Sequence, residues 1–189
     1  MSNSAAQKDN CDVDKSRFVG GTSDAFREMC RGIGSTVSLV ATEHDGRRFA
    51  MVATSVCSVS MDPPSLLICV NTEASAYHAV VERAAFSLGI LHSSAGHIGD
   101  HVARMPGSER FSQGNWSVFN EADQELGGLP WLSDSQATAF CLVEKRFDYG
   151  THSVFVARVR LLTFASDTHD PLLYCEGRFG RFQPVIGGT

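Results

Sequence analysis

Apolar and polar residues alternate along most of this chain with the period of β-strands, interrupted by three stretches with the spacing of amphipathic helices. Strands are predicted at residues 35–42, 49–54, 65–70, 86–91, 137–147, 153–164 and 171–182. Helices are predicted at residues 22–32, 71–84 and 94–105. Short turns join most of the strands, so the pattern predicts a mainly β fold with inserted helices, built as a closed antiparallel barrel. A parallel Rossmann sheet fits poorly, because its strands would alternate regularly with helices of about 10–15 residues.

Local signals set the ends of several elements. Thr22 or Ser23 can cap the first helix. The Asp-Gly pair at 45–46 favours a tight reversal between the first two strands. The prolines of Asp-Pro-Pro at 62–64 must lie outside a central strand, because proline donates no ladder hydrogen bond. Residues 106–136 lack a clear period and are predicted to be rich in loops.

The composition places these elements in one domain. A chain of 189 residues with 43% hydrophobic residues can bury a substantial core. We predict a flexible polar tail over residues 1–21 and a single domain over residues 22–189. The 16 Lys and Arg against 21 Asp and Glu give a net charge of −5, which offers no footprint for nucleic acid.

The sequence also bears on where the protein works. No stretch reaches the ~20 consecutive apolar residues of a membrane span, and residues 1–17 lack the apolar centre of a signal peptide. The 6 cysteines include no Cys-x-x-Cys pair, so reduced thiols are expected. We therefore expect a cytoplasmic protein that binds neither nucleic acid nor membranes.

Hydroxyl side chains interrupt the apolar pattern between residues 53 and 60, in the segment "ATSVCSVS". A buried hydroxyl without a partner costs roughly 1–3 kcal/mol, so a strand that only filled a core would use Val, Ile and Leu. A row of hydroxyls and backbone N–H groups that crosses the barrel mouth beside an apolar wall would suit a flat ring edged with heteroatoms. Each hydroxyl by itself has a simpler interpretation, because turn chemistry also favours Ser and Thr where a strand becomes a loop.

The segment "ATSVCSVSMDPPSLLICVN" at residues 53–71 resembles the signature of the short-chain flavin reductases, the reductase components of two-component flavin-dependent monooxygenases. The resemblance continues in "TEASAYHAVVERAAFSLGIL", "SERF", "YGTHSVFVARV" and "PLLYCEGRFGRF", and spans roughly residues 25–182. It implies an FMN-binding split β-barrel and a homodimer with the flavin near the subunit interface. The expected partner is a flavin-dependent monooxygenase that receives the reduced flavin.

The resemblance also implies which residues hold the flavin, either FMN or FAD. The isoalloxazine would be lined by Ala53, Thr54, Ser55, Val56, Ser58, Val59 and Ser60. Val70 and Asn71 would lie beside the ribityl chain, and Phe111 of "SERF" belongs to the same site. Ser75 would start a helix whose N–H groups and dipole suit a phosphate, although an ordinary N-cap serine gives the same signal. Arg178 would approach a flavin or nucleotide phosphate; a solvated arginine near a chain end is the simpler alternative.

The nicotinamide site is implied by Gly150-Thr151-His152, which stands where the family usually has Gly-Asp-His. The resemblance assigns these three residues to nicotinamide binding, with His152 as the catalytic residue that holds NADH or NADPH over the flavin ring. Thr151 replaces the usual acid, so His152 lacks an adjacent carboxylate. No pattern separates NADH from NADPH; the adjacent basic pair at 47–48 follows a hairpin turn and is interpreted as solvated.

Other reactive residues are given ordinary roles. His97 and His101 have the i, i+4 spacing of metal ligands and His92 precedes them, but no third ligand is evident and the intervening glycines weaken the helix. We predict no metal site. Cys57 and Cys69 are redox candidates beside the flavin segment, although a free cysteine is typically a small buried hydrophobe.

The resulting expectation is an NAD(P)H-dependent flavin reductase that transfers a hydride to FMN or FAD. Few catalytic side chains are needed, because the protein mainly stacks two rings and places donors along the flavin edge. Two alternatives remain open: a flavin-dependent reductase of ferric ion or another small molecule, and a module that binds flavin without catalysis. Oxidases of pyridoxamine phosphate share the barrel, but their basic phosphate cluster is not seen.

Overall fold

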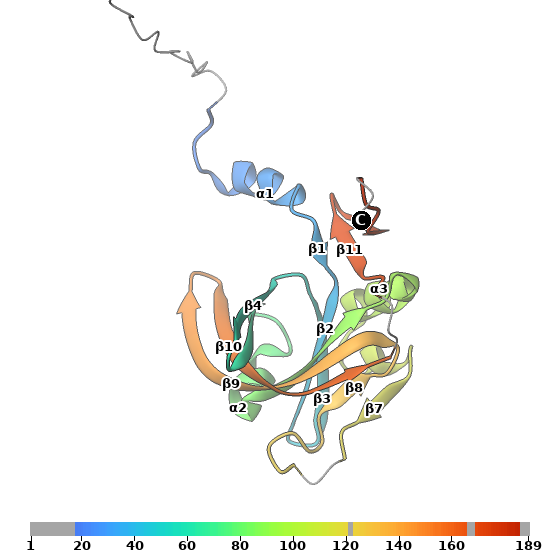
Figure 1. Cartoon of the computed structure of the whole chain (residues 1–189). Coiled ribbons are helices and arrows are strands. Elements are labelled where there is room, and N and C mark those ends of the chain that lie inside the picture. Colours follow the sequence, from blue (N-terminus) through green and yellow to red (C-terminus); the bar gives the residue numbers. More distant parts are fainter. Residues whose placement is uncertain (1–17, 121–122, 166–168, 186–189) are drawn as a thin grey trace, which may run out of the picture.

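The computed structural model describes residues 18–120, 123–165 and 169–185, so most of the predicted tail lies outside the described residues. Its helical elements are α1 (Ser23–Arg31), α2 (Tyr77–Arg83), α3 (Gly96–Arg104) and the short 3-10 helices η2 (Ser93–Ala95) and η3 (Gly107–Phe111). Its strands are β1 (Ser35–Thr36), β2 (Ser38–His44), β3 (Arg47–Ala53), β4 (Val56–Met61), β5 (Pro64–Asn71), β6 (Ala85–Leu91), β7 (Trp116–Val118), β8 (Pro130–Leu132), β9 (Ser135–Tyr149), β10 (His152–Phe164), β11 (Leu172–Cys175) and β12 (Arg178–Arg181). The predicted mainly β architecture with inserted helices is confirmed (Figure 1). None of the helices in the described ranges is long and apolar enough to cross a membrane.

One sheet of seven strands, in the order β3-β2-β6-β9-β10-β5-β4, forms the body of the protein. Every neighbouring pair in it is antiparallel. β3 and β4 therefore run in the same direction at opposite ends of this order, although only Thr54 and Ser55 separate them in the chain. So short a link holds the two ends of the sheet together. The sheet thus curls into a barrel that is split between β3 and β4, as predicted.

The hairpin of β2 and β3 shows how local chemistry fixes the register. Asp45 and Gly46 both have positive φ, at 52° and 70°, which is the conformation of a two-residue turn that matches the twist of the strands. The turn pairs His44 with Arg47 and, at the far end, Ser38 with Ala53. The predicted reversal is confirmed, and it sets which residues of β3 face each side of the barrel.

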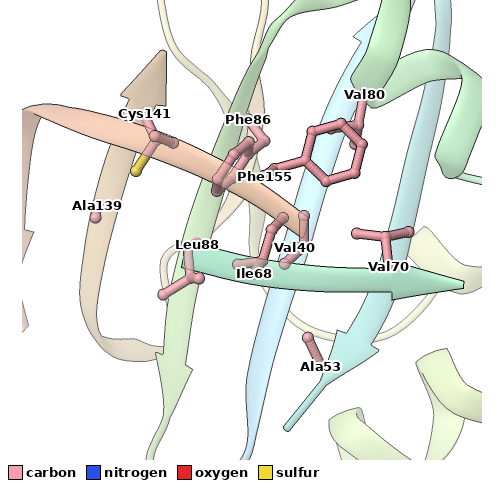
Figure 2. Close-up of a cluster of buried hydrophobic side chains, with 11 residues drawn as sticks. Val40, Ala53, Ile68, Val70, Val80, Phe86, Leu88, Ala139, Cys141 and Phe155 are labelled. Carbon is pink, nitrogen blue, oxygen red and sulfur yellow. The ribbon is translucent and has the colours of Figure 1, made fainter. Parts of the chain in front are cut away.

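The interior of the barrel is filled by apolar side chains from strands that are far apart in sequence. Figure 2 shows Phe86 of β6 and Phe155 of β10 together with Ile68, Val70 and other members of this cluster. Both phenylalanines are at most 1% exposed. Full burial of such a side chain stabilises the fold by roughly 1.5–3 kcal/mol. The predicted apolar runs are therefore the walls of the core.

A second apolar cluster lies on the other face of β2 and β3, where α3 covers it. Ala50 and Leu39 come from the strands, while Ile98 and Val102 come from α3, which lies within the helix predicted at residues 94–105. All four side chains are at most 4% exposed. This packing fixes α3 against β3 and so determines what lines the cavities described below.

The C-terminal segment departs from the prediction. Residues 171–182 were expected to form one closing strand of the barrel, but they form the hairpin of β11 and β12, in a separate sheet with β1. The cause is local: Glu176 and Gly177 have positive φ, at 50° and 77°, and reverse the chain. β11 pairs with β1 in antiparallel fashion, and it lies beside α3 in Figure 1. This hairpin therefore forms a wall next to β3 instead of another strand of the barrel.

Two further elements refine the predictions. α1 begins after the cap Thr22 and ends at Gly32, as expected, but none of its residues is buried and it projects from the body in Figure 1. The stretch predicted as loop-rich contains η3 and the short antiparallel pair β7 and β8. In that stretch Trp116 Nε1 donates to the Gln113 carbonyl at 2.9 Å, which anchors the loop.

Candidate functional site

The hydroxyl-rich segment lies at the split of the barrel. Thr54 and Ser55 form the link between β3 and β4, and the Ser55 carbonyl accepts a hydrogen bond from the Cys69 N–H at 3.1 Å. Residues 53–60 were expected to leave the strand and cross the barrel mouth; residues 56–61 instead form β4, paired with β5. Backbone groups of β4 are thus partly used by its neighbour. The polar groups free for a ligand are concentrated at the link.

The hydroxyls of this segment have different surroundings. Thr54 is half-buried and lines a cavity, whereas Ser55 and Ser58 are exposed. The Ser60 hydroxyl donates to the Asp62 carbonyl at 2.9 Å and accepts from the Asp62 N–H at 3.1 Å, so it serves the turn into β5. Three of the predicted hydroxyls therefore remain available at or near the split.

The apolar residues predicted for the flavin site also divide. The side chains of Ala53 and Val70 belong to the buried core, at 6% and 1% exposure, so only their backbones can meet a ligand. Val56 packs partly against the same core. Val59 stands at a register shift between β4 and β5 and is half exposed. These apolar side chains therefore contribute little to the predicted apolar wall of the flavin site, which must come from backbone atoms and from neighbouring helices and strands.

A cavity of about 430 Å³ lies between the start of β3 and η3. Its walls are Gly46, Arg47, Arg48, Phe49, Ala50, Ser75, Gly107, Ser108, Arg110 and Phe111. Two predicted residues, Ser75 and Phe111, meet here. Three arginines accompany them, and among the described residues no acidic side chain contributes to the walls. We call this the arginine cavity; its charge suits an anionic group such as a phosphate.

Arg110 fastens this cavity together. Its Nε donates to the Met105 carbonyl at 2.6 Å, and its Nη1 donates to the Ala50 carbonyl at 2.5 Å and to Ser75 Oγ at 3.2 Å. These acceptors are neutral, so none of these contacts offsets the positive charge of the guanidinium. The Arg48 guanidinium lies 4.5 Å from the centroid of the Phe111 ring, a cation–π arrangement that holds this second cation at the wall.

Sequence reasoning missed both cations. The pair at 47–48 is predicted to be solvated, and the predicted site contains Phe111 but not its neighbour Arg110. One signal was present: strand alternation places Arg48 on the same face of β3 as Ala50, and that face is covered by α3 and η3. The approach of Arg110 to β3 depends on tertiary structure and had no local signal.

Ser75 does not have the predicted role. α2 begins at Tyr77, and its N-cap is Ala76, which makes no side-chain capping bond. Ser75 therefore lies outside the helix, with its hydroxyl accepting from Arg110. The anion-binding character of this corner comes from arginine side chains instead of the end of a short helix.

A second cavity, of about 520 Å³, lies further along the same face of β3. Its walls are Val37, Val52, Thr54, Asp100, Ala103, Arg104, Tyr174, Gly177 and Phe179. Arg104 Nε donates to Asp100 Oδ1 at 2.7 Å, so the charges at this wall are paired. Tyr174 and Phe179 contact each other edge to face, with centroids 5.6 Å apart. We call this the aromatic cavity; it is mostly apolar and suits a flat ring.

The two cavities are consecutive along one strand face. Arg48 and Ala50 line the first cavity. Val52 of β3 and Thr54, the first residue after β3, line the second, so alternate residues along the chain pass from one cavity to the other. Ala50 and Thr54 are separated by about 13 Å along a strand. An elongated ligand with an anionic end and a planar end fits this arrangement. Arg178, at the start of β12, is exposed and is a wall residue of neither cavity; its neighbour Phe179 takes the place next to the site.

The predicted nicotinamide residues lie at the turn between β9 and β10. His152 pairs with Asn71 across the two strands β10 and β5, so the structure brings these two predicted residues together. The Thr151 hydroxyl lies 2.9 Å from His152 Nδ1, which gives the imidazole a hydroxyl partner where the usual acid is missing. The Thr151 carbonyl accepts from the Thr72 N–H at 3.0 Å, and this bond ties the turn to the end of β5.

The histidines weighed as metal ligands have other partners. His101 Nε2 is 2.9 Å from both the Glu109 carbonyl and Ser112 Oγ, so it joins α3 to η3. His92 Nδ1 lies 2.8 Å from Ser94 Oγ. Within the described ranges no three His, Cys, Asp or Glu side chains gather as metal ligands would.

Comparison with known proteins gives a consistent result. A family model described as flavin reductase like domain matches residues 29–183. The chain is 35% identical over 166 residues to "FMN reductase (NADH) RutF 2" of Methylorubrum extorquens, with 86% of this chain and 91% of that protein covered. Among solved structures, the NADH:FAD oxidoreductase SgcE6 of Streptomyces globisporus has a TM-score of 0.79 at 25% identity, with 88% and 98% of the chains covered. BorF, the flavin reductase component of a bacterial two-component tryptophan halogenase, has a TM-score of 0.74 at 27% identity, with 86% and 99% covered.

Proposed function

We propose that this chain, which belongs to the flavin reductase family, uses NADH to reduce FMN or FAD and supplies the reduced flavin to a partner monooxygenase. The observation that carries the proposal is the pair of consecutive cavities along β3, one cationic and one apolar. They match the phosphate and the ring system of a flavin. Relatives named as NADH-dependent FMN reductases support NADH as the reductant.

The flavin phosphate would lie in the arginine cavity, contacted by Arg48, Arg110 and the Ser75 hydroxyl. Its ring would lie at the split of the barrel, against Thr54 and the aromatic cavity. The remaining members of the predicted flavin set are Ala53, Ser55, Val56, Ser58, Val59, Val70 and Asn71; the buried ones among them would contribute through their backbones. Ser60 and Arg178 are removed from this set, because one serves a turn and the other lines neither cavity.

When bound, the flavin would supply the ring nitrogen to which the hydride of the nicotinamide is transferred. The chain's own residues bind and orient the two molecules. Arg48 and Arg110 neutralise the phosphate, while Thr54 and free N–H groups of the link donate to the heteroatom edge of the ring, where negative charge increases on reduction. His152 would hold the nicotinamide above the ring, its imidazole oriented by the Thr151 hydroxyl. Alignment of two rings at roughly 3–3.5 Å is the main source of rate enhancement.

We also propose a homodimer, because exposed apolar side chains remain on the outer ends of the long strands. Leu162 and Phe164 of β10 are 57% and 60% exposed, and Met61 at the end of β4 is 81% exposed. Light scattering at micromolar concentration tests this: twice 20.4 kDa is expected, and a single 20.4 kDa species would contradict it. Cys57 is exposed, so the expectation of a buried hydrophobe was wrong for it. Exposed thiols such as Cys57 and Cys175 favour a reducing compartment, and we place the protein in the cytoplasm.

Steady-state oxidation of NADH, with added FMN, FAD or ferric ion, tests the function. A flavin reductase must saturate with added flavin, and its anaerobic turnover must bleach the yellow colour of the flavin. Saturation with ferric ion at constant flavin would favour the small-molecule reductase. Flavin binding without bleaching by NADH would favour a non-catalytic module. The same assay with NADPH determines which nicotinamide is used.

A further inference from the structure

Three polar or aromatic side chains form a row across three strands beside the proposed nicotinamide site. Asn71 of β5 pairs with His152 of β10, and His152 pairs with Tyr149 of β9. Residues directly opposite each other in antiparallel strands have side chains on the same face of the sheet. Asn71, His152 and Tyr149 therefore follow one another on one face, at intervals of about 4.8 Å between strands.

The end of this row is fixed by contacts on both sides of the turn. Gly150 has a φ of 59°, which allows the tight two-residue reversal between Tyr149 and His152. The Thr72 N–H and hydroxyl both donate to the Thr151 carbonyl, at 3.0 and 3.3 Å. On the opposite face, Ser153 Oγ donates to Asp148. The strand ends that carry the row are thus held before any ligand binds.

Tyr149 is the most exposed aromatic side chain near the site. It is 84% exposed and contacts no other aromatic ring among the described residues. Phe147, two residues earlier on the same face of β9, is 56% exposed. A tyrosine offers a large flat surface at a small entropic cost, because it has only two side-chain torsions to fix.

We propose that Tyr149 is an NADH-binding residue whose ring stacks on the adenine of the dinucleotide. This rests on the proposed function, in which His152 holds the nicotinamide. In the strand order β9-β10-β5-β4, Asn71 of β5 lies on the side of His152 toward β4 and Tyr149 of β9 on the side away from it. A dinucleotide with its nicotinamide at His152 can therefore extend its adenosine half over Tyr149. The chemistry recognised is a planar base, and Tyr149 takes no part in hydride transfer.

The test compares NADH with reduced nicotinamide mononucleotide, which carries the same reacting ring and lacks adenine. Tyr149→Ala should raise KM for NADH about tenfold, the order expected for the loss of one ring stacked on a base, while kcat and KM for the flavin stay unchanged. KM for the mononucleotide should not change. Tyr149→Phe and Tyr149→Trp keep a ring and should stay within about twofold of wild type. Phe147→Ala is the matched control and should leave KM for NADH unchanged.

Several results would overturn the inference. KM for NADH could remain at the wild-type value in Tyr149→Ala, or rise equally for NADH and the mononucleotide. A change in KM for the flavin, or a changed mass in light scattering, would assign the ring to the flavin or to an interface between copies. Wild-type protein that does not oxidise NADH with flavin would instead contradict the proposed function, so the two failures are distinguishable.

Discussion

Arg110 Nη1 donates to the backbone carbonyl of Ala50 at 2.5 Å, which fastens η3 to the middle of β3. Through this bond one side chain joins the wall that carries Phe111 to the strand that carries the proposed flavin contacts. Arg110 also reaches Ser75, so it holds three separate segments at the arginine cavity. Structure and binding should therefore respond differently to the two cations of this cavity, Arg48 and Arg110.

Arg48→Ala should weaken FMN binding without changing riboflavin binding, because riboflavin lacks the phosphate. Loss of one charged contact predicts a rise in the FMN dissociation constant of about 10- to 100-fold. Fluorescence titration with FMN and with riboflavin measures both constants. Arg27→Ala, which removes an exposed arginine of α1, is the control for net charge. An equal loss for FMN and riboflavin would place the phosphate elsewhere.

Arg110→Ala should lower the free energy of unfolding as well as FMN affinity. It leaves the buried Ala50 carbonyl without the guanidinium donor, and one such unsatisfied group costs about 1–3 kcal/mol. Urea unfolding measures the loss. Ser75→Ala removes only the longer contact and should cost less than about 1 kcal/mol. Equal free energies of unfolding for the two variants would show that the hydrogen bond to Ala50 does not stabilise the fold as proposed.

Thr151→Val should lower kcat/KM for NADH about two- to tenfold, because it removes the hydroxyl that lies against His152 Nδ1. Thr151→Ser keeps a hydroxyl and should behave as wild type, and Thr151→Asp supplies the acid usual in the family and should be at least as active. His152→Ala should lose more than Thr151→Val. Steady-state kinetics with varied NADH at saturating flavin measures each value; an inactive Thr151→Ser with an active Thr151→Val would contradict the assignment.

Asp170 makes part of the stability of the C-terminal hairpin depend on pH. The hydrogen bond from Ser93 and the nearby Arg181 guanidinium lower the pKa of the Asp170 carboxyl from its ordinary value of 3.8, against a smaller opposing effect of burial. Since the folded state favours the ionised form, this contribution is fully present above the ordinary value. It is lost as the pH falls through that value and below it.

Asp170→Asn should therefore flatten the acid side of the stability profile below about pH 5, where the carboxyl of the unfolded chain takes up its proton before that of the folded protein. Urea midpoints at a series of pH values measure this slope for both proteins. Asp24→Asn, which removes an exposed carboxyl of α1, is the matched control and should keep the wild-type slope. A wild-type slope in Asp170→Asn would show that other carboxyls dominate acid unfolding.

Cys141 should be inert while the protein is folded. Burial raises the pKa of its thiol to about 12, and its side chain is fully covered within β9. At pH 8 the reactive thiolate is then a fraction on the order of 10⁻⁴. Titration with a thiol reagent should label the exposed Cys57 and Cys175 quickly and Cys141 only after unfolding, as peptide mapping would show. Rapid labelling of Cys141 in the native protein would mean that β9 opens easily.

How far the sequence predicts this molecule depends on the distance over which each feature is determined. The Asp45-Gly46 turn and the cap at Thr22 are decided by neighbouring residues, and both were correctly predicted. The reversal at Glu176-Gly177 is equally local. It was not predicted, because apolar residues on both sides of it suggested one continuous strand over residues 171–182. The apolar runs gave the strands because burial on both faces leaves a clear pattern.

The site was less predictable, because it is assembled by packing. The role of Ser75 depends on Arg110, which lies 35 residues later in the sequence and reaches it only once η3 is placed against β3. The family resemblance predicts roles for Thr54, Asn71 and His152 through the segments that carry them, and these roles stay predictions. It did not identify Arg48 and Arg110, whose side chains come together only in the folded protein.

The passage of the chain from β3 into β4 has one further consequence. These two strands are the margins of the rolled sheet, and each has a strand partner on one side only, so the seam between them is where main-chain amides are least committed. A ligand that contacts both β3 and β4 would link the two edges of the barrel. Flavin binding should then slow amide hydrogen exchange in β3 and β4 together. A reductase that releases its reduced flavin would lose this protection of both strands in every catalytic cycle.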